Sequence, residues 1–221
     1  DKLSIYNMDN MELMKQIPDK YFDLAIVDPP YGISYEQQAF KVNGVKTLNA
    51  KAKKGNYLFK NWDSETPSKE YFLELFRISK NQVIWGGNYM IENINKNSNC
   101  WIVWDKDNNT NNFADCELAW TSFKSSVRKI KLTWNGMIQS DMSNKETRIH
   151  PTQKPISLYS WILEKYAKEG MKIFDSHLGS GSNAIACHYA KMEFIGCELD
   201  SDYYNDSVKR IRENTKQLQL F

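Results

Sequence analysis

The tetrapeptide Asp28-Pro29-Pro30-Tyr31 follows an apolar run, FDLAIV at residues 22–27, that has the length and composition of a buried strand. In open α/β sheets, ligands bind just outside the carboxyl ends of the strands. Two prolines stiffen the backbone here and remove two N–H donors, which leaves the Asp28 carboxylate and the Pro29 carbonyl as rigid acceptors. Such acceptors suit a planar base with an exocyclic NH2 group, on whose ring Tyr31 can stack. The alternative for the tetrapeptide alone is a strand end closed by proline.

A second segment, IFDSHLGSGS at residues 173–182, has the pattern of a strand, a glycine turn and the start of a helix. Its glycines allow a cofactor to approach the backbone, and the acid before them can accept a hydrogen bond from a hydroxyl or cationic group. The next predicted strand ends in a glutamate, where a carboxylate can bind both hydroxyls of a ribose. The candidate cofactor residues of this region are Asp175, His177, Gly179, Gly181 and Glu198.

A nicotinamide-dependent oxidoreductase is an alternative, because Gly179 to Ala184 also matches the pattern G-x-G-x-x-A. The acid in front of the turn and the lack of basic side chains within it favour a cofactor without a pyrophosphate. A third segment, HPTQKP at residues 150–155, places a short polar stretch between two prolines in front of a predicted helix. Taken alone, this segment is explained as a capped helix entrance.

The elements that must position these segments alternate along the chain. Short apolar runs of strand length alternate with stretches of helical periodicity that begin at capping residues or prolines. The predicted strands are 3–6, 22–27, 82–85, 101–104, 117–121, 171–174 and 194–197. The predicted helices are 10–16, 69–79 after a cap at Thr66, 155–168 with Gly170 as its C-cap, 182–191, and a last helix from Ser201 as its cap to residue 216. This alternation predicts an α/β fold with a mostly parallel sheet.

Two regions, residues 32–64 and 121–149, do not follow the alternation and are long, polar and poorly periodic. Loops of this length in a compact domain are usually functional or disordered. Each contains a run of basic residues without an acid, interleaved with aromatic residues, which suits phosphate neutralisation and base stacking. A solvated lysine-rich loop is the alternative for each run. The candidate DNA-binding residues are Lys41, Lys46, Lys51, Lys53, Lys54, Lys124, Arg128, Lys129 and Lys131.

The composition restricts the class of protein. The 221 residues carry 29 Lys+Arg against 27 Asp+Glu and are 41% hydrophobic, which is typical of a single globular domain over residues 1–221. No apolar run approaches the roughly 20 residues of a membrane span, and the first residues do not resemble a secretion signal, so we expect a cytoplasmic protein. The four cysteines lack C-x-x-C spacing and the three histidines lie far apart, so we expect no metal site.

Together, the three segments resemble the N6-adenine DNA methyltransferases of the permuted, beta-type order, which use S-adenosylmethionine (AdoMet). In that family D-P-P-Y precedes a recognition segment, then H-P-T-Q-K-P, then the glycine motif, and the same order covers essentially the whole chain here. One departure is that the family's D-P-F-x-G-S-G reads DSHLGSG at residues 175–181, with Ser176 and His177 in place of Pro and Phe. The resemblance implies a Rossmann-like AdoMet-dependent methyltransferase fold with a circularly permuted motif order, of orphan or phage type.

The resemblance also implies roles for residues. The catalytic residues would be Asp28, Pro29, Pro30 and Tyr31, and His150, Thr152 and Lys154 would lie near the methionine end of AdoMet. Because the lone pair of the adenine amino group is delocalised into the ring, hydrogen bonds to the acceptors would pull the nitrogen toward tetrahedral geometry. Direct attack on the methyl group then needs positioning more than acid–base catalysis. A target base in duplex DNA must be flipped out of the stack.

The peptide QLQLF at residues 217–221 resembles the Q-L-x-L-F peptide by which bacterial replication proteins dock on the sliding clamp. In that interpretation Gln217 sets the register, while Leu218, Leu220 and Phe221 enter an apolar groove. The alternative is that these apolar side chains pack against the protein's own core.

The sequence therefore predicts a site-specific DNA methyltransferase, a monomer or homodimer, that transfers a methyl group from AdoMet to adenine N6. Residues 32–64 are predicted as a basic loop near the active site, and residues 121–149 as a target-recognition insertion. Aspartate rather than serine at the first position of the tetrapeptide favours adenine N6, and a cytosine-N4 or RNA methyltransferase is the alternative within the fold. A non-catalytic DNA-binding module tethered to the clamp is the alternative of a different class.

Overall fold

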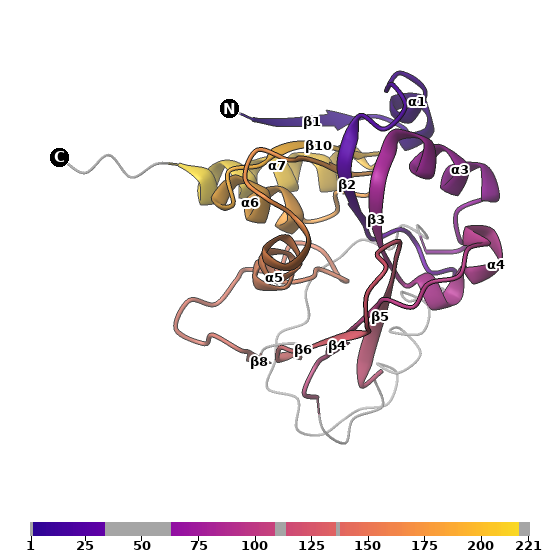
Figure 1. The fold of residues 1–221 in the computed structure, drawn as a ribbon. Coiled ribbons are helices and arrows are strands. Elements are labelled where there is room, and N and C mark those ends of the chain that lie inside the picture. The colour runs from indigo at the N-terminus through magenta and orange to yellow at the C-terminus, as the bar shows by residue number, and fades with distance from the viewer. Residues whose placement is uncertain (1, 34–62, 109–113, 136–137, 217–221) are drawn as a thin grey trace.

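A computed structural model describes residues 2–33, 63–108, 114–135 and 138–216 (Figure 1). The strands are β1 (Leu3–Asn7), β2 (Phe22–Val27), β3 (Ser79–Trp85), β4 (Trp101–Asp105), β5 (Cys116–Thr121), β6 (Arg128–Lys131), β7 (Trp134–Asn135), β8 (Ile138–Gln139), β9 (Lys172–Asp175) and β10 (Glu193–Glu198). The helices are α1 (Asn10–Lys15), α3 (Lys69–Ile78), α4 (Ile91–Ile94), α5 (Ile156–Tyr166), α6 (Ser182–Tyr189) and α7 (Ser201–Thr215), with a 3-10 turn η1 (Gly87–Tyr89). None of these described helices combines the length and apolar character needed to cross a membrane.

The described strands form one large sheet and one small ribbon. The large sheet has eight strands in the order β1-β10-β9-β2-β3-β5-β4-β6, and β7 pairs with β8 in the ribbon. The first five strands of this order are parallel, β5 is antiparallel to both of its neighbours, and β6 is parallel to β4. All strands of the large sheet except β5 therefore point the same way. The predicted α/β fold with a mostly parallel sheet is confirmed.

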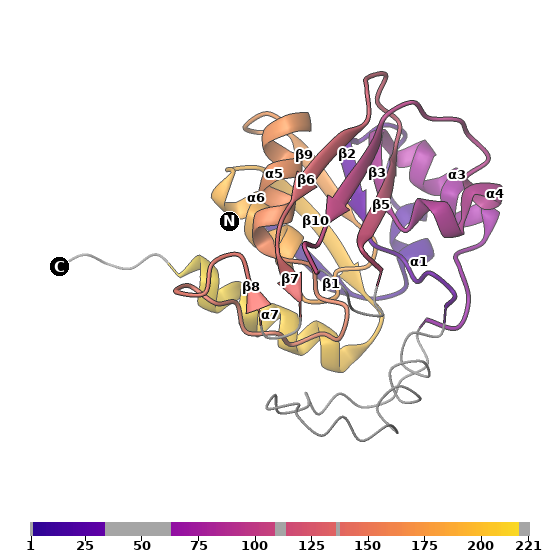
Figure 2. The same ribbon diagram turned by 90° about the horizontal axis from the view of Figure 1, so that it is seen from below.

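Helices cover both faces of the sheet (Figures 1 and 2). On β2, Leu24 and Ile26 belong to the core that includes side chains of α5 and α6, whereas Ala25 and Val27 belong to the core that includes side chains of α1 and α3. Successive side chains of a strand point to opposite faces, so a strand covered on both faces is apolar almost throughout. This explains why FDLAIV reads as a continuous apolar run.

Some boundaries differ from the prediction. The caps of α3 and α7 are Ser68 and Asp200 rather than Thr66 and Ser201. The Asp200 carboxylate accepts hydrogen bonds from the N–H groups of Asp202 and Tyr203 in the first turn of α7. Helix α5 ends with Ala167 as its C-cap, so Gly170 lies instead in the turn before β9.

The segment 121–149 was predicted to lack regular structure, but it contributes β6 to the large sheet and the β7–β8 ribbon. The sequence of β6, RKIK, gave no apolar pattern because this strand lies at the edge of the sheet, where most of its side chains are exposed. Most of the predicted basic loop, residues 34–62, lies outside the described residues.

Candidate active site

A cavity of about 620 Å³ opens at the carboxyl edge of the parallel strands. The residues that follow β1, β10, β9 and β2 all contribute to its wall, as expected for an α/β sheet. The three segments singled out in the sequence therefore meet in one place. The residues that line the cavity are Met8, Asp9, Asn10, Asp28, Pro30, His150, Thr152, Gln153, Lys154, Tyr159, Ser176, His177, Leu178, Gly179, Ser180, Ser182, Glu198, Leu199, Asp200, Ser201 and Tyr203.

The glutamate at the end of β10 joins the glycine turn to the start of α7. Glu198 accepts hydrogen bonds from the N–H of Gly179 at 2.9 Å and from the N–H of Asp200 at 3.0 Å. Burial raises the pKa of the Glu198 carboxyl, and these backbone donors oppose that shift. Its side chain thus forms part of the cavity wall in a fixed orientation.

Asp175 supports the turn from beneath and is not among the lining residues. Its carboxylate accepts from the N–H of His177 at 3.1 Å and from the Asn183 side-chain amide at 3.0 Å. Burial raises the pKa of Asp175 to about 8. Gly179 lines the cavity, whereas Gly181 packs under α7, where a Cβ would lie 2.8 Å from a carbon of Ile211.

The unusual pair Ser176-His177 is part of a chain of hydrogen bonds in the cavity wall. The hydroxyls of Tyr71 and Ser176 lie 2.6 Å apart, Ser176 Oγ lies 2.8 Å from His177 Nδ1, and His177 Nε2 lies 3.1 Å from the Asn10 amide nitrogen. Because an amide nitrogen only donates, Nε2 accepts and Nδ1 carries the proton. Burial lowers the pKa of His177 to about 4, so the imidazole is neutral at pH 7.

The tetrapeptide forms the other end of the cavity. Asp28 Oδ1 lies 2.6 Å from Lys154 Nζ and accepts the Tyr31 hydroxyl at 2.8 Å, and Lys154 also donates to the Tyr31 oxygen at 3.0 Å. The backbone N–H groups of Tyr31 and Gly32 both donate to Asp63 Oδ1, at 2.6 and 3.0 Å. The carboxylate of Asp63 therefore holds the turn that follows the two prolines.

The ring of Tyr31 is fixed by the residues after β3. It stacks on Tyr89 with 5.2 Å between the ring centroids and 18° between the planes. A Cβ on Gly86 would lie 2.2 Å from Cε1 of the same ring, so only glycine fits there. Tyr89 is 48% exposed and covers the Tyr31 ring on the outside.

Sequence reasoning missed Glu117 on β5, which completes this cluster. Glu117 Oε2 lies 3.1 Å from Lys154 Nζ and 3.3 Å from the Tyr31 oxygen, whose proton is donated over the shorter distance to Asp28, and Glu117 Oε1 contacts Lys106. Burial raises the pKa of Glu117, but the two ammonium groups lower it more, to about 2. The pKa of Lys154 is raised, because Asp28 and Glu117 outweigh the effect of burial. A lone acid in the otherwise apolar strand sequence ELAW was the available clue.

Sequence reasoning also missed the residues after β1. Met8, Asp9 and Asn10 line the cavity because β1 pairs in parallel with β10, so the two strands end at the same edge. Nothing in the local sequence indicates this pairing, which joins residues far apart in the chain.

The segment 150–155 forms a wall of the cavity and contacts residues of the segment 121–149. His150, Thr152, Gln153 and Lys154 all line the cavity. The indole N–H of Trp134 donates to the Gln153 carbonyl at 2.8 Å, which ties β7 to this wall.

The predicted DNA-binding residues divide into two groups. Lys124, Arg128, Lys129 and Lys131 are exposed on or just before β6, and the last two pair with Asp105 and Asp107, each at 2.8 Å. The other five, Lys41, Lys46, Lys51, Lys53 and Lys54, lie outside the described residues, as do Gln217, Leu218, Leu220 and Phe221.

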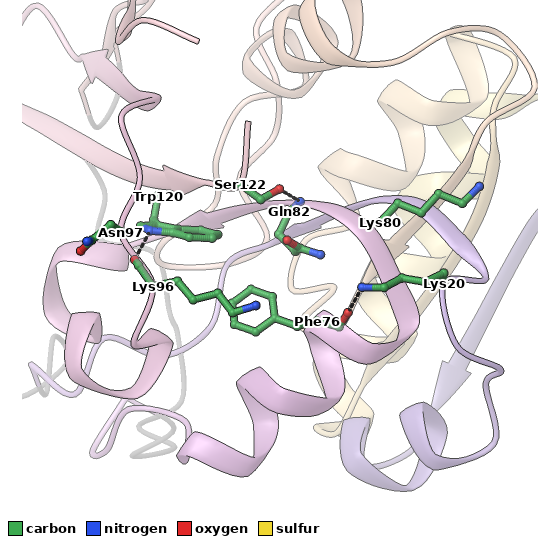
Figure 3. Close-up of a pocket in the computed structure, with 8 residues that line it drawn as sticks. All are labelled: Lys20, Phe76, Lys80, Gln82, Lys96, Asn97, Trp120 and Ser122. Atoms are coloured by element: carbon green, nitrogen blue, oxygen red, sulfur yellow. Dashed lines mark hydrogen bonds between the residues drawn. The ribbon is translucent and has the colours of Figure 1, made fainter. Parts of the chain in front are cut away.

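A second, smaller pocket of about 260 Å³ lies near the amino ends of β2 and β3, opposite the cavity (Figure 3). Its three lysines already have partners: Lys20 donates to the Phe76 carbonyl at 2.5 Å, Lys80 pairs with Asp23 at 2.7 Å, and Lys96 lies 4.0 Å from the centre of the Phe76 ring. We therefore take the larger cavity as the candidate active site.

Comparison with known proteins identifies the family. The family model described as DNA methylase, for N6 and N4 methyltransferases, matches residues 22–209. The type II methyltransferase M.HinfI of Haemophilus influenzae is 25% identical, over 95% of this chain and 68% of its own length. The type II methyltransferase M2.MboI of Moraxella bovis is 26% identical, over 98% of this chain and 90% of its own length.

Solved structures share the fold at low sequence identity. The M1.HpyAVI–SAM complex has a TM-score of 0.59 at 20% identity, over 95% of this chain and 98% of that one. The cytosine-N4-specific PvuII DNA methyltransferase has a TM-score of 0.60 at 14% identity, over 97% of this chain and 92% of that one. Because the family model spans most of the chain, including the tetrapeptide and the glycine turn, this protein belongs to the N6/N4 DNA methylase family.

Proposed function

We propose that this DNA methylase transfers a methyl group from AdoMet to the N6 amino group of adenine in DNA. The main support is the position of Asp28, where the cavity meets the buried Lys154 and the half-buried Tyr31 and Glu117. Its Oδ1 accepts from Tyr31 and Lys154, whereas Oδ2 has no hydrogen-bond partner within the part of the chain that the structure describes. One oxygen of a fixed carboxylate is thus left to accept from a substrate.

The cavity fits AdoMet in size and in its polar groups. Glu198 at the end of β10 would hold the ribose hydroxyls, and His150 and Thr152 would hold the methionine part. Lys154, predicted from the sequence to join them, instead directs its ammonium to Asp28, Tyr31 and Glu117. When bound, AdoMet supplies a methyl group on a positively charged sulfur. The SAM complexes of M1.HpyAVI and of TTHA0409 from Thermus thermophilus, which share the fold, support this assignment.

The residues at the tetrapeptide would position the target amino group. Asp28 Oδ2 and the Pro29 carbonyl would each accept one N–H of the amino group, which localises the lone pair of its nitrogen. No base needs to remove a proton before attack, because a neutral aromatic amine is too weak an acid. Tyr31 and the outer ring of Tyr89 would stack against a base flipped out of the duplex, offsetting a few kcal/mol of unstacking.

The choice of adenine N6 over cytosine N4 rests on Asp28 itself. Aspartate at the first position of the tetrapeptide favours adenine in the family that the sequence resembles. The fold does not discriminate, because the cytosine-N4-specific PvuII enzyme has a similar one. The recognition segment 121–149 would contact the DNA beside the base, together with the basic residues of 32–64.

The test is to identify the methylated nucleoside. The purified protein is incubated with mixed-sequence DNA and AdoMet labelled in its methyl group, and the DNA is digested to nucleosides. We expect labelled N6-methyladenine, lost in Asp28→Ala and kept in Asp23→Asn, which removes a carboxylate from the opposite edge of the sheet. N4-methylcytosine would move the proposal to cytosine, and label on RNA alone would overturn it.

We further propose that residues 217–221 dock on the bacterial sliding clamp and that the enzyme acts in the cytoplasm as a monomer or homodimer. The support for docking is the match of Gln217, Leu218, Leu220 and Phe221 to the clamp-binding pattern. Purified clamp should be retained by the wild-type protein and not by the double variant Leu220→Ala, Phe221→Ala. Equal retention by both proteins would contradict the proposal.

A further inference from the structure

We propose that Glu117 is a positioning residue that holds the Lys154 ammonium between two carboxylates, so that Asp28 keeps one oxygen free for the target amino group. The inference rests on the proposed role of Asp28 as the acceptor of that group. Glu117 is outside the cavity wall, on β5, and acts through Lys154 and Tyr31.

The hydrogen-bond geometry fixes Lys154. Its ammonium has three N–H donors, and three acceptors surround it: Asp28 Oδ1 at 2.6 Å, Tyr31 OH at 3.0 Å and Glu117 Oε2 at 3.1 Å. The Lys154 side chain is 3% exposed, so water does not compete for these donors. Without the Glu117 carboxylate, the donor that it takes would turn to the nearest remaining acceptor, which is Asp28.

The charges of the cluster balance. Asp28 and Glu117 supply two negative charges, and Lys154 and Lys106 supply two positive charges. As the target nitrogen bonds to the methyl group, the bond from that methyl group to the sulfur breaks and its electron pair stays on the sulfur. The positive charge thus passes to the nitrogen, which keeps it until one of its protons is lost to water. If Asp28 alone balanced the charge of Lys154, little negative charge would remain to stabilise the positive nitrogen. Because Glu117 also balances Lys154, the Asp28 carboxylate can stabilise the nitrogen.

The position of Glu117 makes this role distinct from a purely structural one. The Glu117 side chain is 21% exposed, and a carboxylate that is largely removed from water costs free energy unless it is paired; Lys106 alone, on Glu117 Oε1, would pair it. The second contact, from Oε2 to Lys154 and Tyr31, connects Glu117 to both groups that bind Asp28 Oδ1. That contact has no counterpart in ordinary strand packing.

The test compares Glu117→Gln with Glu117→Asp, which retains the charge. We expect Glu117→Gln to lower the single-turnover rate of methyl transfer roughly tenfold or more, and Glu117→Asp to recover part of the loss. AdoMet affinity measured by calorimetry should stay within about twofold, because Glu117 does not line the cavity. Asp23→Asn, which removes a lysine-paired carboxylate of the same sheet far from the cavity, should keep the wild-type rate.

The pH profile gives a readout that a loss of packing would not move. The charged and titratable groups around Asp28 are Lys154, Glu117, Tyr31, Tyr159 and Asp175. Removing the Glu117 charge lowers the pKa of Asp28, so the acid limb of the rate profile should shift to lower pH in Glu117→Gln and stay in place in Glu117→Asp.

A wild-type rate in Glu117→Gln, or a rate loss that follows an equal loss of AdoMet binding and thermal stability in both variants, would overturn the inference. The proposed function is judged separately, by the nucleoside that the wild-type protein methylates. If Asp28→Ala is inactive while Glu117→Gln is fully active, only the role of Glu117 fails. If Asp28→Ala methylates adenine normally, the role of Asp28 fails and the inference about Glu117 fails with it, whereas adenine-N6 methylation by the wild-type protein still stands.

Discussion

Gly86 positions the Tyr31 ring, because its φ of 66° and the ring carbon 2.2 Å from a would-be Cβ both require glycine. Gly86→Ala should therefore displace Tyr31 and, with it, the hydroxyl that donates to Asp28. Gly170→Ala is a matched control, since its φ of 82° is also positive but no atom lies within 4 Å of the added Cβ. Backbone strain should lower the free energy of unfolding by about 1 kcal/mol in each alanine variant. Gly86→Ala should lose more stability, because its Cβ also clashes with the Tyr31 ring.

Urea unfolding and methyl-transfer rates test this prediction together. We expect Gly170→Ala to lose only stability, and Gly86→Ala to lose stability and most of its activity while still binding AdoMet. Equal activity in the two variants would mean that the position of the Tyr31 ring does not matter.

His177 should make stability depend on pH. Its pKa is about 4 when folded and its ordinary value is 6.5, so between these values the unfolded chain binds more protons than the folded one. Stability must then fall as the pH drops from 6.5 to 4, by on the order of 2 kcal/mol from this group. His177→Phe should flatten the dependence in that window. Urea unfolding at pH 4.5, 5.5 and 6.5 measures the free energy of unfolding of both proteins. If this free energy falls equally with pH in the wild-type protein and in His177→Phe, the prediction is wrong.

Among the elements, α7 joins the glycine turn to the segment 121–149 through one side chain. Arg210 donates to the Ser180 carbonyl at 2.7 Å and to Ser182 Oγ at 3.0 Å, and it pairs with Glu146 at 2.6 Å. Glu146 also accepts the first N–H of α5, from Ile156 at 2.9 Å. One buried guanidinium therefore connects the glycine turn with Glu146 of the segment 121–149, and Glu146 in turn caps the start of α5.

Replacing this side chain should affect stability and cofactor binding at once. Arg210→Met leaves Glu146 without its charged partner and should lower the free energy of unfolding by about 3 kcal/mol. The affinity for AdoMet should also fall, because Ser180 and Ser182, which Arg210 holds, line the cavity. Arg212→Met, on the exposed side of the same helix, should change neither property. Urea unfolding and calorimetry would contradict the prediction if the two variants behaved alike.

The elements also show what the sequence could and could not reveal. The strand before Asp28 and the strand before the glycine turn were predictable, because burial on both faces makes them apolar throughout. Strand β6 was missed because it is polar and exposed at the sheet edge. Asn10 and Glu117 were missed because only the pairing of distant strands brings them to the site, and no local pattern encodes that pairing.

For the whole molecule, the common direction of the strands places the chemistry on one edge of the sheet. Strand β6 is parallel to β4, which runs with the core strands, so its last residue, Lys131, lies at the edge that holds the cavity. Lys124 precedes β6 and lies toward the opposite edge. Phosphate contacts fix how a protein sits on DNA, so a duplex presenting a base to Asp28 should contact Lys131 before Lys124.

This ranking predicts different effects of two charge-equivalent variants. Lys131→Ala should weaken binding across DNA sequences and reduce the salt slope of log Kd by about 1, because one phosphate contact is lost. Lys124→Ala should leave the affinity for DNA and its salt slope nearly unchanged. Lys131 pairs with Asp107, so Asp107→Asn should strengthen binding by freeing the lysine. DNA titrations at several salt concentrations measure all three. A larger loss in Lys124→Ala than in Lys131→Ala would place the DNA across the amino edge of the sheet, away from Asp28.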